Sequence, residues 1–238
     1  MNSRESSMID YSIEGDNLEI VRIRLQPGDE IVAEAGKMVY KTPQVAWATT
    51  MHGKGIGQKL LGGLKRKLTG ESLFLTHFSC QHEGGEVGFA GDFPGRMRPL
   101  HLDNGQSILV QSGGFVVSES TVKLDIALTR RLGAGLFGGE GFILQRLSGP
   151  GIAFIHAGGD FVEFDLKPNE TLQVDTGCIV CFDDSVQYSI ELAGGIKTSV
   201  FGGEGLFLAT LTGPGKVVVQ TLTINRLRRE LAAGLQTS

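Results

Sequence analysis

The chain has 238 residues and a formal net charge of −4, with charged residues making up 20% of the sequence. This balance argues against a general polyanion-binding protein, because nucleic-acid binders usually carry a basic surplus that neutralises phosphate. Glycine is unusually frequent, at 35 residues, which predicts many tight turns between short strands rather than a helical protein.

The first recurring element is a turn. It occurs at residues 25–31, 102–108 and 166–172. In the first copy Pro27 precedes Gly28, and in the third Pro168 precedes Asn169, which is the pattern of a type II turn with positive φ at its third position. The middle copy has an Asn-Gly pair at residues 104–105, the dipeptide preferred in type I′ hairpin turns. The three turns predict a shared backbone bend rather than a shared ligand.

A half-buried strand is expected after each turn, because apolar residues then stand two apart. These residues are Ile31 and Ala33, Ile108 and Val110, and Leu172 and Val174. A second bend follows at Gly36, Gly113 and Gly177. The three copies therefore predict one β-unit used three times.

A second motif, a Gly-Glu pair leading into apolar residues, recurs at residues 70–75, 139–144 and 203–208. Motif spacing places about eight extra residues in the first copy, within residues 51–69. We predict a single all-β domain over residues 8–225, a sandwich-like body built of three pseudo-symmetric repeats. Their expected boundaries are 8–91, 92–157 and 158–225.

Helical spacing occurs in only two places. Leucines and isoleucines recur through the insertion at 56, 60, 64 and 68. They recur again at 224, 227, 231 and 235, where Gly234 stands near the expected helix end. We therefore predict short accessory helices, with residues 226–238 as a helical C-terminal tail.

The combination of an L-x-P-G-D turn, a glycine-rich insertion and the run Gly-Glu-Ser-Leu-Phe-Leu at 70–75 resembles the mitochondrial-biogenesis (altered inheritance of mitochondria) family, whose bacterial members form a domain of unknown function. The resemblance covers residues 8–225. It implies a fold like that of the tryptophan RNA-binding attenuation protein, and it implies a homotrimer. It supplies no catalytic residues and no cofactor.

Three repeated carboxylates are the candidate metal ligands. Glu71, Glu140 and Glu204 stand at equivalent positions and could converge on a pseudo-threefold axis around a hard cation. The competing interpretation is that each lies in a glycine-flanked turn, where it accepts backbone hydrogen bonds or faces water. The second interpretation is the favoured one.

The insertion at 51–69 is the candidate interaction site, because its later part is basic and amphipathic. Its cations are Lys59, Lys65, Arg66 and Lys67. Such a segment could lie on an anionic membrane surface or contact a protein partner. The alternative is an ordered loop packed at a subunit interface or over the open end of the β-body.

The remaining sequence motifs give weaker indications of function. Cys178 and Cys181 match C-x-x-C, but they lie in a strand-like run and are interpreted as buried structural cysteines. The G-x-G-x-x-G match at 133–138 lacks the strand and helix that dinucleotide binding requires. The five histidines form no ligand pattern. No catalytic signature is present, which lowers the expectation of enzyme activity.

The sequence favours a non-enzymatic homotrimeric scaffold or interaction module. A small-ligand or nucleic-acid binding module is the alternative, and a metal-dependent enzyme using the repeated glutamates is the third hypothesis. No signal-peptide core and no apolar stretch of about 20 residues is present, so a cytoplasmic protein is expected.

Overall fold

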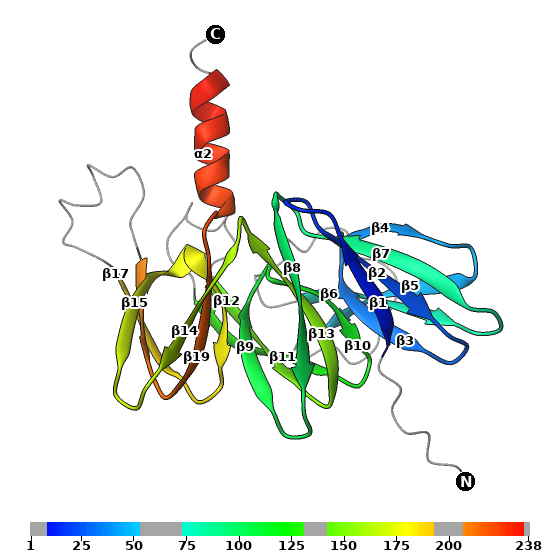
Figure 1. Ribbon diagram of the computed structural model, residues 1–238, viewed down its shortest axis with the longest axis horizontal. Helices are drawn as coiled ribbons and strands as arrows, with labels where there is room; N and C mark the ends of the chain where they lie inside the picture. The colour runs from blue at the N-terminus through cyan, green and yellow to red at the C-terminus, as the bar shows by residue number, and fades with distance from the viewer. Residues whose placement is uncertain (1–8, 53–72, 131–141, 193–206, 236–238) are drawn as a thin grey trace.

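The computed structural model describes residues 9–52, 73–130, 142–192 and 207–235. These residues form antiparallel β-sheets with one α-helix at the C-terminal end (Figure 1). The predicted all-β fold is therefore confirmed.

The described strands lie in four sheets, and in each sheet every strand is hydrogen-bonded to the next one named. The first sheet has β1 (Asp10–Glu14), β2 (Ile20–Leu25), β7 (Gly85–Ala90) and β4 (Met38–Lys41). The second has β5 (Val45–His52), β6 (Leu73–Cys80), β3 (Glu30–Glu34), β10 (Phe115–Glu119), β13 (Gly151–Gly158) and β8 (Gly95–Leu102). The third has β11 (Lys123–Arg130), β12 (Phe142–Ser148), β9 (Ser107–Gln111), β16 (Ile179–Asp183), β19 (Gly215–Gln220) and β14 (Phe161–Leu166). The fourth has β15 (Thr171–Asp175), β18 (Phe207–Thr212) and β17 (Gln187–Leu192), and the short 3-10 turn η1 (Thr176–Cys178) precedes β16.

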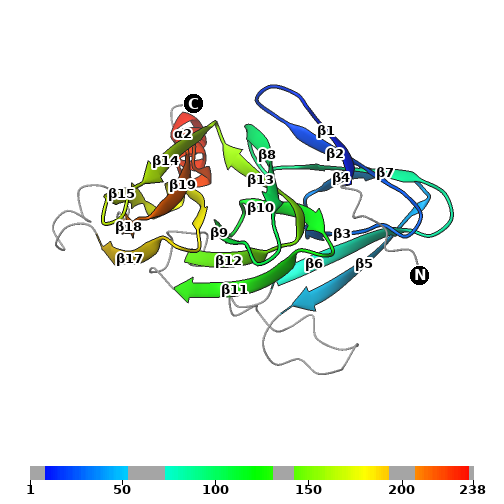
Figure 2. The same cartoon turned by 60° about the horizontal axis from the view of Figure 1, so that its bottom comes forward.

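The same order of pairing occurs three times along the chain. The strands β2-β7-β4, β8-β13-β10 and β14-β19-β16 pair in one order, and β5-β6-β3, β11-β12-β9 and β17-β18-β15 pair in another. We refer to β2–β7 as the first strand set, β8–β13 as the second and β14–β19 as the third. Figures 1 and 2 show the three sets side by side in a row along the long axis of the molecule.

Two joins connect neighbouring sets into continuous six-stranded sheets. β3 pairs with β10 across the first join, where Ala33 is opposite Val117. β9 pairs with β16 across the second, where Val110 is opposite Cys181. At the two ends of the row, β4 and β15 are the outermost strands of the first and fourth sheets. Each end therefore presents a strand edge that no described strand covers.

The core follows from alternation along the strands. In β2, the side chains of Val21, Ile23 and Leu25 are buried, while Arg22 and Arg24 point to the opposite face. Buried apolar residues form three clusters along the row, and the strands of each join contribute to two of them. The strand joins are therefore part of the hydrophobic core.

The recurring turns carry the chain from one sheet to the next. Positive φ occurs at their third position in all three, at Gly28 (93°), Gly105 (83°) and Asn169 (64°). Asn104 does not have the positive φ that a type I′ turn requires, so the predicted type I′ turn at 104–105 is wrong. The reason is that β8 and β9 lie in different sheets, so this turn does not close a hairpin.

The C-terminal helix α2 (Ile224–Leu235) begins two residues before 226, where the helical tail was expected to start. The Thr223 hydroxyl accepts a hydrogen bond from the Arg226 backbone N–H and so satisfies one amide of the first turn. Within the described residues, no helix has the length and apolar content needed to cross a membrane. The expected helix in the insertion lies outside the described residues.

Candidate functional site

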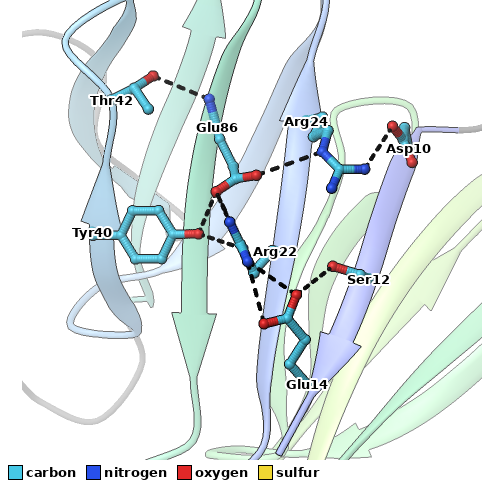
Figure 3. Close-up of polar contacts among 8 residues, drawn as sticks. All are labelled: Asp10, Ser12, Glu14, Arg22, Arg24, Tyr40, Thr42 and Glu86. Carbon is cyan, nitrogen blue, oxygen red and sulfur yellow. Dashed lines mark hydrogen bonds and ion pairs between the residues drawn. The ribbon is translucent and has the colours of Figure 1, made fainter.

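The outer face of the first sheet carries a network of charged and hydroxyl side chains (Figure 3). Two rows of residues cross the sheet. One row is Asp10, Arg24 and Glu86, and the other is Ser12, Arg22, Gly88 and Tyr40. Because strands alternate their side chains, the polar residues of both rows lie on one face while their neighbours enter the core. We call the set Arg22, Arg24, Tyr40 and Glu86 with Glu14 and Asp10 the polar network.

Glu86 is the centre of the polar network. Its Oε1 accepts hydrogen bonds from Arg22 Nη2 at 2.7 Å and from the Tyr40 hydroxyl at 2.6 Å. Arg22 also donates from Nε to the Tyr40 oxygen at 2.8 Å, and its Nη1 donates to Glu14 Oε1 at 3.0 Å. The network thereby links β1, β2, β7 and β4 through side chains as well as through the backbone ladder.

A glycine makes this arrangement possible. Gly88 lies on β7 between Arg22 and Tyr40, and a side chain there would collide with the Tyr40 ring. Because Gly88 has no side chain, the tyrosine ring can lie across β7, and its hydroxyl reaches both Arg22 and Glu86. Gly88 therefore acts through close approach rather than through backbone freedom.

The pKa shifts of Glu86, Tyr40 and Arg22 keep these three groups in one protonation state near neutral pH. Hydrogen bonds from Tyr40 and Arg22 lower the pKa of Glu86, so it stays ionised. Burial and the neighbouring Glu86 carboxylate raise the pKa of Tyr40, so it stays protonated. The pKa of Arg22 is raised as well, chiefly by Glu86. The geometry suits a fixed, fully hydrogen-bonded surface and not proton transfer.

The polar network adjoins the exposed edge strand β4, where Val39 is 58% exposed. The positions aligned with Val39 after the recurring glycines are Val116 and Val180, which are 0% and 2% exposed. All three valines lie at a break in strand register, in β4, β10 and β16 respectively. The edge strand β4 thus has the same register break as β10 and β16, but no described strand pairs with its outer edge.

A second surface feature is a groove between β8 and the third sheet, with a volume of about 460 Å³. Arg98 and Lys216 on its walls are both paired with Glu163, at 2.7 and 3.0 Å. Arg98 also lies 4.1 Å from the ring centroid of Phe161. The cations of the groove are therefore already engaged by groups of the protein itself.

Two buried polar side chains, Lys37 and His156, lie between the first and second strand sets, near the exposed carboxylate of Asp92. The Lys37 ammonium, almost wholly buried, contacts the Asp92 carboxylate at 2.5 Å. His156 is also buried, its ring packed against Phe93 and Gly91. Burial, with a contribution from the charge of Lys37, lowers the pKa of His156 to about 4. The imidazole is therefore neutral at physiological pH.

The candidate residues expected from the sequence lie outside the described part of the chain. These are the proposed metal ligands Glu71, Glu140 and Glu204, and the basic residues Lys59, Lys65, Arg66 and Lys67. The glycine run at 133–138 lies outside it too. Among the described residues, no three His, Cys, Asp or Glu side chains are close enough together to hold a metal ion. The metal and membrane hypotheses stay predictions.

The cysteines agree with their interpretation as buried thiols. Cys80, Cys178 and Cys181 are unbridged and buried. Burial raises the pKa of Cys178, and it raises that of Cys181 to about 12, so neither thiol is activated. Cys178 ends the 3-10 turn η1 rather than lying in a strand, since β16 begins one residue later.

The polar network is the feature that sequence reasoning missed. One signal was present, because Arg22 and Arg24 alternate with Val21 and Ile23 and so indicate a polar strand face. The partners could not be found in this way, since Tyr40 and Glu86 come from strands distant in sequence that meet β2 only through the pairing order of the sheet.

Comparison with known proteins agrees with the fold. An uncharacterised protein of Streptococcus pyogenes serotype M6, M6_Spy0233, is 28% identical over 244 residues, which span 99% of this chain and 96% of that protein. The crystal structure of protein SPYM3_0169 from Streptococcus pyogenes superposes with a TM-score of 0.73 at 24% identity, covering 94% of this chain and 99% of the other. The model of the family described as mitochondrial biogenesis AIM24 matches residues 11–222. The chain therefore belongs to the mitochondrial biogenesis AIM24 family.

Proposed function

We propose that this protein is a non-enzymatic scaffold or interaction module that works as a homotrimer in the cytoplasm. The proposal includes the division of the chain into three equivalent repeats. It is supported by the recurring order of strand pairing in the three strand sets. Three buried, unbridged cysteines suit a reducing compartment.

One observation carries the proposal: the edge strand β4 exposes an apolar residue that is buried wherever the aligned strand is joined. Val39 is 58% exposed, while Val116 and Val180 are covered at the joins. An uncovered strand edge offers unpaired N–H and C=O groups to another chain, and apolar side chains along it favour that pairing. The end of the row thus has the properties of an assembly surface.

The polar network supports a role in binding rather than catalysis. Its charges pair with one another, with Glu86 ionised and Tyr40 protonated. Such a face can be covered by a partner without leaving an unpaired buried charge. General acid–base catalysis would instead favour a group whose pKa lies near neutral pH.

Native mass spectrometry of the full chain tests the proposal. We expect the main species to have three times the mass of the chain at micromolar concentration. A protein that stays monomeric at all accessible concentrations would contradict the proposed trimer and with it the scaffold.

A further inference from the structure

The two joins inside the chain follow one register rule. Val117 lies four residues after Gly113, and it pairs with Ala33, which lies three residues before Gly36. At the second join, Cys181 lies four residues after Gly177, and it pairs with Val110, which lies three residues before Gly113. Each join thus brings the same two positions of the recurring strand pattern together.

The two open ends of the row hold the remaining members of this pattern. Tyr40 lies four residues after Gly36, on β4 at one end. Val174 lies three residues before Gly177, on β15 at the other end. Both strands are edges among the described strands, and they lie at opposite ends of the molecule (Figure 1).

From these observations, and resting on the proposed homotrimer, we infer that β15 of one copy pairs antiparallel with β4 of the next copy and extends the row head to tail. The register rule places Tyr40 opposite Val174, Lys41 opposite Gln173, and Thr42 opposite Leu172. The short length of β4 is sufficient, because each internal join also has three registered residue pairs.

The residues buried at the two internal joins indicate which residues the proposed join between copies would bury. Val116 shares a hydrophobic cluster with Ile31 and Ala33 across the first join. Val180 shares one with Ile108 and Val110 across the second. Val39 takes the place of these valines at the end of the row, and the residues that would cover it are Leu172 and Val174 of the neighbouring copy, which are only partly buried in a single chain.

A second pair of exposed apolar residues supports the same contact. Val162 and Phe164 on β14 are 39% and 36% exposed. They align with Val21 and Ile23 of β2, counting back from the last leucine of each strand, and these two residues are fully buried against the second strand set. We therefore place Val162 and Phe164 against the polar network of the next copy.

The polar network is suited to this cover. On the aligned face of the second set lie Val117 and Phe154, at the positions of Tyr40 and Gly88. Gly88 leaves room above β7, and the guanidinium of Arg22 and the ring of Tyr40 offer flat surfaces to an aromatic side chain. Because one end surface meets a different end surface, the contact is heterologous, and a ring closes when the rotation per copy permits.

Paired cysteines test this register. Lys41→Cys and Gln173→Cys in one chain should form a disulfide between copies under mild oxidation, because directly opposed residues have Cα atoms within disulfide range. We expect a covalent trimer on a non-reducing gel, and a crosslinked dimer when the two single variants are mixed. Lys41→Cys with Thr171→Cys is the matched control, since a shift of two residues separates the Cα atoms beyond that range.

The outcomes separate the join from the proposed function. A trimer by native mass spectrometry that gives no crosslink with Lys41→Cys and Gln173→Cys overturns the join and leaves the trimeric scaffold standing. Equal crosslinking by the shifted control pair overturns the register. A chain that is monomeric by mass overturns both proposals.

Discussion

At the scale of single residues, two of the polar side chains buried in the described part of the chain, Gln145 and His156, lie within strands that are otherwise rich in buried apolar residues. Gln145 on β12 is fully buried, and neither its amide oxygen nor its amide nitrogen has a hydrogen-bond partner among the described residues. His156 on β13 is buried in the neutral form beside Lys37. Both lie at positions where alternation alone would place an apolar residue, and both have measurable consequences for stability.

Replacement of Gln145 by methionine should stabilise the protein. The substitution keeps the length of the side chain and removes two buried polar atoms, whose desolvation without partners costs about 1–3 kcal/mol. We expect the free energy of unfolding in urea to rise by about 1–2 kcal/mol. Gln187→Met, at an exposed position of β17, is the control and should change stability little. A loss of stability in Gln145→Met would show that the amide has a favourable role.

Stability should fall as the pH drops from about 6.5 towards 4, in part because of His156. Its folded-state pKa, about 4, lies below the ordinary histidine value of 6.5, so in this window the unfolded chain binds a proton that the folded chain does not. The contribution is at most about 1.4 kcal/mol per pH unit. His156→Gln should flatten the dependence of the free energy of unfolding on pH, and glutamine is the residue at the aligned position, Gln220.

The control for this pH series is His101→Gln, an exposed histidine on β8. It should keep the wild-type slope between pH 6.5 and 4. If His156→Gln also keeps that slope, then His156 is not responsible for the acid sensitivity.

The backbone conformation of two of the three recurring turns could be predicted from the sequence. Positive φ at Gly28 and Asn169 follows from the Pro-Gly and Pro-Asn pairs, because few other residues accept that conformation. The turn type at Asn104 could not be predicted, because it depends on whether the flanking strands form a hairpin. The burial of Gln145 and His156 depends likewise on which sheet faces which.

At the scale of elements, the first sheet is held together by its side chains as well as by its ladder. The polar network joins four strands whose sequence positions are far apart, and Glu86 is in contact with Arg22, Tyr40 and Arg24. β1 is not part of the recurring strand order, and it is fixed at the edge of this sheet through Arg22 and Glu14. The network therefore adds side-chain contacts to the backbone pairing of all four strands of this sheet.

Glu86→Gln should weaken this sheet. The amide loses the charge that pairs with Arg22, and hydrogen bonds of this charge-assisted kind contribute about 1.5–3 kcal/mol each. We expect the free energy of unfolding at pH 7 to fall by about 1–2 kcal/mol for a partly exposed site. Glu191→Gln, an exposed carboxylate on β17, should have little effect and serves as control.

The pH dependence of the free energy of unfolding also tests the role of Glu86. Because the pKa of Glu86 is lowered in the folded state, its contribution is present above the ordinary glutamate pKa and is lost as the pH falls through the folded value. The wild type and Glu86→Gln should therefore converge in stability under acid. A difference in free energy that stays constant down to pH 2 would contradict the ionic role of Glu86.

Strands and the final helix were predictable at this scale, whereas the arrangement of sheets was not. Alternation in residues 20–25 and helical spacing at 224–235 are local signals that fix the type of each element. The pairing of β2 with β7 and of β3 with β10 joins residues far apart in the chain, and no local pattern specifies it. The network and the joins follow from those pairings.

At the scale of the whole molecule, the protein is a row of three strand sets with two unlike ends. One end has β4, Val39 and the polar network, and the other has β15 with Val162 and Phe164 nearby. The sequence pattern indicates three similar units, and the exposure of Val39 beside its buried counterparts supports the proposed pairing of one copy with the next.

The most direct test is the mass of a Val39→Asp variant measured by sedimentation equilibrium beside the wild type. Val39 is largely exposed in the single chain, so the variant should fold, as circular dichroism and thermal unfolding can verify. A carboxylate at the join would be buried without a partner, so we expect a folded monomer where the wild type is a trimer. Leu18→Asp, at an apolar residue that is 72% exposed and lies between β1 and β2, outside β4 and β15, should remain a trimer. A Val39→Asp variant with the wild-type mass would contradict assembly through β4.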